Sequence, residues 1–192
     1  MSRAPNPRHA ASRQARSSAR LAAVQALYQM DVAGTGIEAV IEEFVHDRFS
    51  APRPPGEDEP APPEPEAGEA AIVGADATFF TALIRGTVRC QRDVDPVIDQ
   101  SLAEGWRLVR IDSLVRAILR SAVFELMERT DVPARVVINE YIEVSRAFFD
   151  GDEPKLVNGV LDRLAKQFRP AEFDPKSASD PDPQSGNGPG KG

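Results

Sequence analysis

The chain has 192 residues, of which 41% are hydrophobic, and a formal net charge of −7. This composition predicts one compact domain with polar tails, and it argues against a membrane partner because no apolar run reaches the roughly 18 residues of a membrane span. No apolar signal segment follows the N-terminal arginines, so a cytoplasmic protein is expected. The single Cys90 cannot form an internal disulfide, and the two histidines lack zinc-ligand spacing, so neither a metal nor another cofactor is expected.

Charge is distributed unevenly along the chain. Residues 1–20 contain five arginines and no acidic residue, whereas residues 51–70 contain six acidic residues, one arginine and seven prolines. The basic segment is typical of a protein that binds a polyanion, and the proline-rich segment cannot sustain a helix or a packed core. We therefore expect a largely disordered basic arm over residues 1–16, a disordered acidic, proline-rich insertion over about 50–74, and a disordered tail over 170–192.

The remaining segments carry apolar residues at helical spacing. None of them alternates as a half-buried strand would, so the sequence predicts an all-α fold with a helical domain over residues 17–169. The first helix is expected to start at Ser17 or Ser18 as N-cap, and Pro96 marks an expected kink or break in the third. Short links between the helices imply antiparallel bundle packing. The six expected helices cover about residues 17–33, 37–49, 76–103, 111–128, 133–149 and 151–169.

Three arginines of the basic segment are candidate ligands for nucleic acid. Arg13, Arg16 and Arg20 follow i, i+3, i+7 spacing, so they would share a face if the first helix extended upstream. Guanidinium groups pair bidentately with phosphate and stack on bases. A solvated tail without a partner is the alternative, and the charge pattern alone leaves both open. No convincing catalytic constellation or phosphate-binding glycine loop occurs, so an enzyme is not expected.

Several short motifs together resemble a known family. The segments "AVQALYQ", "AILR", "DVP", "INE" and "VNGVLD" occur in that order, and their combination is similar to the NusB family of bacterial transcription antitermination factors. The resemblance covers about residues 13–49 and 76–169 and implies two small helical bundles packed together. It also implies binding of boxA-type single-stranded RNA together with the ribosomal protein NusE. Such a protein would join the antitermination complex on RNA polymerase, notably on ribosomal RNA genes.

The resemblance further implies roles for individual positions. The RNA contacts that it implies lie in the arm, in "VQALY" and at the start of the last helix; they are Arg13, Arg16, Arg20, Gln25, Tyr28, Lys155 and Asn158. The implied contacts with the partner protein are Tyr28 and Asp152. The acidic insertion and the tail are foreign to the short family pattern, so no role follows for them.

Two points stay open at this level. Some rRNA cytosine methyltransferases carry a NusB-like helical domain at their N-terminus, so a stand-alone RNA-binding domain related to it is the alternative function. Among proteins of the family, some are dimers that hide the RNA-binding surface and others are monomers. A homodimer is therefore neither predicted nor excluded by the sequence.

Overall fold

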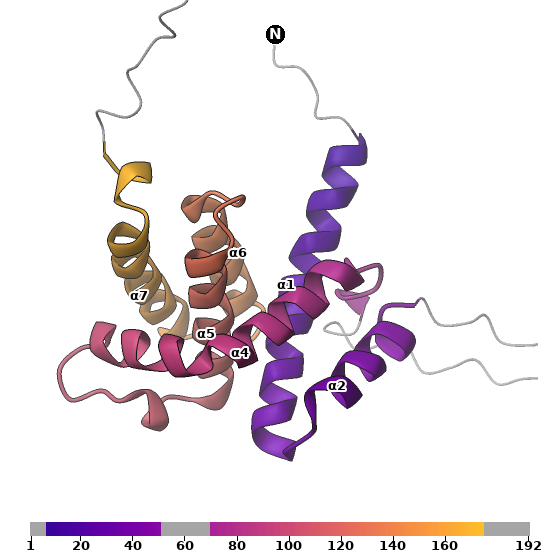
Figure 1. Ribbon diagram of the computed structural model, residues 1–192, viewed down its shortest axis with the longest axis horizontal. Helices are drawn as coiled ribbons and strands as arrows, with labels where there is room; N and C mark the ends of the chain where they lie inside the picture. Colours follow the sequence, from indigo (N-terminus) through magenta and orange to yellow (C-terminus); the bar gives the residue numbers. More distant parts are fainter. Residues whose placement is uncertain (1–6, 51–69, 175–192) are drawn as a thin grey trace, which may run out of the picture.

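The computed structural model describes residues 7–50 and 70–174, and within these ranges the chain contains helices and no strand. The predicted all-α class is confirmed (Figure 1). None of the helices in these ranges combines the length and the apolar composition that a membrane span needs. The α-helices are α1 (Pro7–Ala33), α2 (Ile37–Glu43), α4 (Ala77–Ser101), α5 (Ser113–Glu128), α6 (Ala134–Arg146) and α7 (Glu153–Phe168).

The helices form two groups that share one core. In Figure 1, α4 crosses in front of α1 with α2 beside it, while α6 and α7 stand together on the other side. Helix α5 packs against α1, α4, α6 and α7, and ten of its 16 residues are buried. Burial of this wide apolar surface is the main favourable term in folding. The expected pair of packed bundles is therefore present, with α5 as the element common to both.

Helix α1 begins earlier than predicted. It starts at Pro7, so Ser17 and Ser18 lie in its interior and the prediction that one of them is the N-cap is wrong. The Ser17 hydroxyl donates to the Arg13 carbonyl (3.1 Å), and the Ser18 hydroxyl donates to the Ala71 carbonyl (2.8 Å). Proline suits a first helical position, and the alanine, arginine and glutamine residues that follow are good helix formers. The described part of the predicted disordered arm, residues 7–16, is thus helical; residues 1–6 lie outside the described ranges.

Both ends of the predicted insertion belong to the folded domain. Ile72 is fully buried, and the Gly74 amide donates to the Phe49 carbonyl over 2.9 Å. Gly74 has a φ of +74°, which glycine adopts without strain. The prediction that residues 70–74 belong to a disordered segment is therefore wrong, because the apolar Ile72 and the turn at Gly74 attach them to the core. Residues 51–69 lie outside the described ranges.

The start of the predicted tail is also ordered. A short 3₁₀ turn covers Pro170–Glu172, and the Glu172 carboxylate accepts the Ala134 amide at the start of α6 (2.7 Å). Buried Arg169 donates to the carbonyls of Glu125, Leu126 and Arg129 at the end of α5. These contacts extend the folded domain beyond residue 169. Residues 175–192 lie outside the described ranges.

Pro96 does not break the third predicted helix. Helix α4 runs through it from Ala77 to Ser101, although a proline inside a helix costs roughly 3 kcal/mol. Val94 and Ile98, on either side of Pro96, are fully buried and hold this part of the helix against the core. The start of α4 is as predicted, because the Asp76 carboxylate accepts the Phe79 amide (2.9 Å) as an N-cap does.

Close packing of α4 on α5 predicts opposite effects for two glycine substitutions. A Cβ atom on Gly86 would lie 2.0 Å from Cζ of the buried Phe124, whereas nothing lies within 4 Å of a Cβ atom on Gly159 in α7. We expect Gly86→Ala to lower the free energy of unfolding by about 1–3 kcal/mol through overpacking. Gly159→Ala should raise it by about 0.5–1 kcal/mol through helix propensity. Urea unfolding followed by circular dichroism measures both, and equal effects would contradict the packing argument.

Candidate nucleic-acid interface

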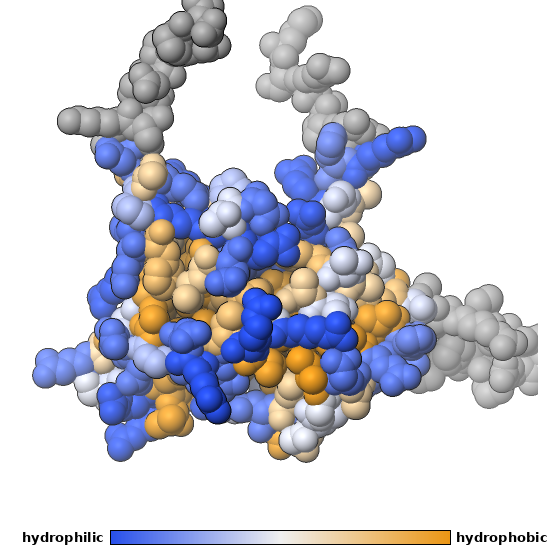
Figure 2. Space-filling model, in the orientation of Figure 1, coloured by the Kyte–Doolittle hydropathy of each residue, from blue (hydrophilic) through white to orange (hydrophobic). Residues whose placement is uncertain are grey.

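The N-terminal half of α1 projects from the domain and carries exposed arginines. In Figure 1 this part of α1 rises past α4, and Figure 2, in the same orientation, shows hydrophilic residues over its end. Arg13 and Arg16 are exposed, and neither guanidinium group makes a hydrogen bond among the described residues. The Arg16 guanidinium lies 5.4 Å from the centroid of the Phe79 ring, a cation–π distance. This contact restrains Arg16 while its N–H donors stay available to a ligand.

Arg20, one turn further along, is not part of this surface. It is only 3% exposed, and it donates to both carboxylate oxygens of Glu125 (3.0 and 2.6 Å) and to Glu140 (3.2 Å). Burial lowers the pKa of Arg20, but the hydrogen bond and the charge of Glu125 outweigh burial and leave that pKa raised. The prediction that Arg20 contacts RNA is wrong for this structure, because a core carboxylate occupies its guanidinium group.

The buried Glu125 carboxylate also accepts a hydrogen bond from a neutral hydroxyl group. The Tyr141 hydroxyl donates to Glu125 over 3.1 Å and lies 2.8 Å from the Ser121 hydroxyl. Burial, followed by the nearby charge of Glu125, raises the pKa of Tyr141 well above its ordinary value, so the phenol stays protonated and remains a donor. The network thereby joins α1, α5 and α6 at the base of the projecting segment.

Arg129 and Phe79 also belong to the region beside the arm, although neither was predicted from the sequence as a site residue. The Phe79 ring has the Arg129 guanidinium 5.2 Å from its centroid, in addition to Arg16 and Arg20. Arg129 pairs bidentately with Asp131 (2.9 and 3.0 Å), and this hydrogen bonding lowers the pKa of the Asp131 carboxyl group. Helical periodicity marks Phe79 as a core residue, and no signal in the sequence places these arginines around one ring.

Gln25 and Tyr28 lie further along the same helix. Gln25 is half-buried and Tyr28 is 39% exposed, so each offers part of its side chain to solvent. Counting back by three or four residues from Tyr28 gives Gln25, Leu21, Ser17 and Gln14, which therefore follow one side of α1. The structure thus aligns the two predicted contacts with a mostly polar stripe that starts in the arm.

The predicted contacts near α7 are exposed. Asp152 precedes the helix, and its carboxylate accepts from the Lys155 ammonium group (2.7 Å) rather than from a backbone amide. This hydrogen bond lowers the pKa of Asp152 and raises that of Lys155. Asn158 is exposed one turn further on. The roles assigned to these three residues stay predictions.

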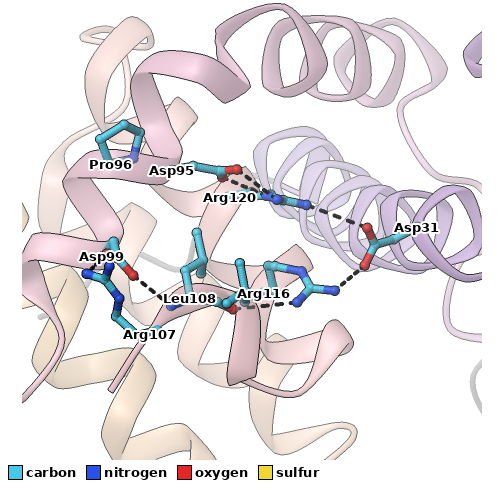
Figure 3. A pocket seen from close by; sticks show the side chains of 9 residues that line it. Asp31, Asp95, Pro96, Asp99, Arg107, Leu108, Arg116 and Arg120 are labelled. Atoms are coloured by element: carbon cyan, nitrogen blue, oxygen red, sulfur yellow. Dashed lines mark hydrogen bonds and ion pairs between the residues drawn. The ribbon is translucent and has the colours of Figure 1, made fainter. Parts of the chain in front are cut away.

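A second surface feature is a groove of about 610 Å³ bordered by α1, α4 and α5 (Figure 3). Arginine and aspartate side chains pair across it: Arg120 with Asp95 (2.7 Å), Arg116 with Asp31 (2.5 Å) and Arg107 with Asp99 (2.9 Å). Val109, which is 81% exposed, lies at its edge. Because its charges are balanced, this ionic groove is a poorer site for a polyanion than the arm. The described residues contain no group of three or more acidic, cysteine or histidine side chains suited to a metal ion.

The different environments of Arg20 and Arg13 predict different effects on folding. Arg20→Ala would leave the fully buried Glu125 without its cation, so we expect it to lower the free energy of unfolding by about 3–5 kcal/mol. Arg13→Ala should change it by less than about 0.5 kcal/mol because the side chain is exposed. Urea unfolding compares the two variants with the unmodified protein, and a small effect of Arg20→Ala would contradict the structural role.

Comparisons with known proteins place this chain in a family. The chain matches the NusB family model over residues 17–166. The transcription antitermination protein NusB of Maricaulis maris (strain MCS10) is 53% identical over 159 residues, which are 82% of this chain and 90% of that protein. The protein of the same name from Rhizobium rhizogenes (strain K84 / ATCC BAA-868) is 46% identical over 169 residues, covering 88% and 97%. Both names describe proteins of transcription antitermination.

Solved structures agree in fold. T. maritima NusB is 28% identical, gives a TM-score of 0.60 and matches over 82% of this chain and 95% of its own. A chain in the crystal structure of a plectonemic RNA supercoil is 22% identical with a TM-score of 0.62, matching over 79% and 94%, and is similar in fold. The family match spans most of the folded domain. This chain aligns with almost the full length of the Maricaulis maris and Rhizobium rhizogenes proteins. The chain therefore belongs to the NusB family.

Proposed function

We propose that this protein binds single-stranded RNA through the projecting half of α1 and acts in transcription antitermination. The observation that carries the proposal is the state of Arg13 and Arg16, whose guanidinium groups are exposed on a helix already formed and make no hydrogen bond among the described residues. A preformed helix loses less entropy on binding than a disordered arm would. The family relatives named as transcription antitermination proteins support the same role.

We propose boxA-type RNA as the ligand, the ribosomal protein NusE as partner, and assembly with RNA polymerase in the cytoplasm. Tyr28 and, one turn further along α1, Val32 (62% exposed) present apolar surface that a protein partner would remove from water. Gln25, Lys155 and Asn158 are proposed as further RNA contacts, and Asp152 as a partner contact.

A stand-alone RNA-binding domain related to the rRNA cytosine methyltransferases is the second candidate. It shares the proposed RNA surface but does not involve NusE. The relatives described above favour the first candidate, because they carry the antitermination name and match over 90% and 97% of their own lengths. An effect of NusE on RNA binding distinguishes the two candidates.

Loss of the two exposed arginines should change the salt dependence of RNA binding. In Arg13→Ala/Arg16→Ala we expect weaker binding and a slope of log K against log salt that is shallower by about 1.4, at ~0.7 per phosphate contact. Fluorescence anisotropy at several salt concentrations measures the slope. The control is Arg85→Ala/Lys166→Ala, which removes the same charge from exposed positions on α4 and α7. An equal change in the control would assign the effect to net charge rather than to the arm.

The antitermination function predicts a specific response to NusE. Binding of a boxA-type RNA and of a scrambled RNA is measured by anisotropy, each with and without NusE. We expect a preference for the boxA-type strand that increases when NusE is added, because a second protein surface adds contacts to the same complex. Equal, purely salt-dependent affinities that NusE does not alter would contradict the antitermination role and leave only nonspecific RNA binding.

A further inference from the structure

A hollow of about 310 Å³ lies between α1 and α6, immediately beside the arm. Leu21 and Val144 give it an apolar part, and its polar lining includes Gln14, Glu140 and Glu143. Gln14 and Leu21 belong to the mostly polar stripe of α1 that continues to Gln25 and Tyr28. The hollow is therefore continuous with the proposed RNA surface.

Part of the polar lining is unused within the described chain. The Gln14 amide makes no hydrogen bond there. Glu140 uses only Oε2, for Arg20, and Glu143 uses only Oε1, for Arg146. The hollow thus offers two carboxylate oxygens and one amide to a ligand. Arg20 does not line the hollow, but its hydrogen bond to Glu140 holds the Glu140 side chain in position.

The chemistry of the hollow fits a nucleobase and not a phosphate group. Carboxylates repel phosphate, but they accept hydrogen bonds from the amino groups of bases, as Glu and Asp accept from N4 of cytosine. Adenine, cytosine and guanine carry such amino groups and uracil does not. An unstacked base also needs an apolar contact for its face, which Leu21 and Val144 supply.

The position of the hollow relative to the arm fits a single strand. Ser17, which lines the hollow, lies one helical turn from Arg13, about 6 Å along the helix axis. A phosphate bound at Arg13 and a base turned toward α6 can therefore belong to the same stretch of backbone. Phosphate contacts set the position of a strand, and contacts with base edges set its sequence.

We propose that the hollow between α1 and α6 receives one unstacked, amino-bearing base of the bound RNA. The Glu143 carboxylate accepts from the amino group of the base, and the Gln14 amide bonds to the ring edge. This inference rests on the RNA-binding function proposed above and adds a site of base selection to it. The arm supplies affinity that is independent of sequence, and the hollow discriminates against uracil.

The test uses a boxA-type RNA in which each amino-bearing base is replaced in turn by uridine. For the unmodified protein we expect at least one replacement to weaken binding about fivefold or more, as loss of a good base contact does. Glu143→Gln should reduce that penalty, because the amide is a weaker acceptor for an amino group and its N–H groups can donate to uracil. The penalties at other positions and the salt slope should be unchanged. Fluorescence anisotropy gives each dissociation constant, and urea unfolding verifies that the variant is folded.

Glu38→Gln is a matched control. Glu38 on α2 is 69% exposed and paired with Arg85, and Glu143 is 70% exposed and paired with Arg146. Both variants remove one negative charge from an exposed ion pair, so a general electrostatic effect would appear in both. We expect Glu38→Gln to retain every uridine penalty of the unmodified protein.

Three outcomes would overturn the proposal. If Glu143→Gln and Gln14→Ala both retain every uridine penalty, the hollow does not select a base, while the effect of Arg13→Ala/Arg16→Ala still reports separately on RNA binding by the arm. If Glu143→Gln weakens the NusE effect without changing base preference, the carboxylates serve a basic side chain of a protein. If the unmodified protein binds no single-stranded RNA, the proposed function fails as well.

Discussion

The buried pairing of Arg20 with Glu125 is the interaction on which the arrangement of the domain depends. Glu125 is fully buried in α5, and Arg20 comes from the middle of α1. An ion pair in a core gives little net stability compared with apolar residues of similar size, but either member alone is a costly unpaired charge. The pair therefore specifies one relative position of α1 and α5. Tyr141 adds α6 to the same constraint.

This constraint lets a single helix serve as core element and as binding surface. From Ala19 to Leu27, α1 buries a largely apolar face in the domain, and before Ser17 it projects with its side chains in solvent. Arg20 lies at the boundary between the two parts. Because the helix is continuous across it, the core sets the direction of the projecting part, and Arg16 is restrained further by the Phe79 ring. The affinity of the projecting part of α1 for a polyanion therefore depends on an orientation that contacts in the core determine.

Much of the fold follows from local patterns in the sequence, whereas the site depends on contacts between distant residues. The helical periodicity of α5 and the start of α4 near residue 76 are local features, and both were predicted correctly. Charge alone could not distinguish Arg20 from Arg13 and Arg16, because the partner of Arg20 lies 105 residues away in the sequence. The helical start at Pro7 was not predicted either. A basic segment suggested disorder, although its alanine and arginine residues favour a helix.

The hydrogen bond between Gly74 and Phe49 has a consequence for how the family can vary in sequence. It holds Phe49 and Gly74, which flank residues 51–69 in the sequence, next to each other in the domain. The entropic cost of closing a loop grows only slowly with its length. Evolution can therefore lengthen, shorten or recompose the chain at this junction at little energetic cost, which makes it a place where new sequence enters an otherwise constrained protein.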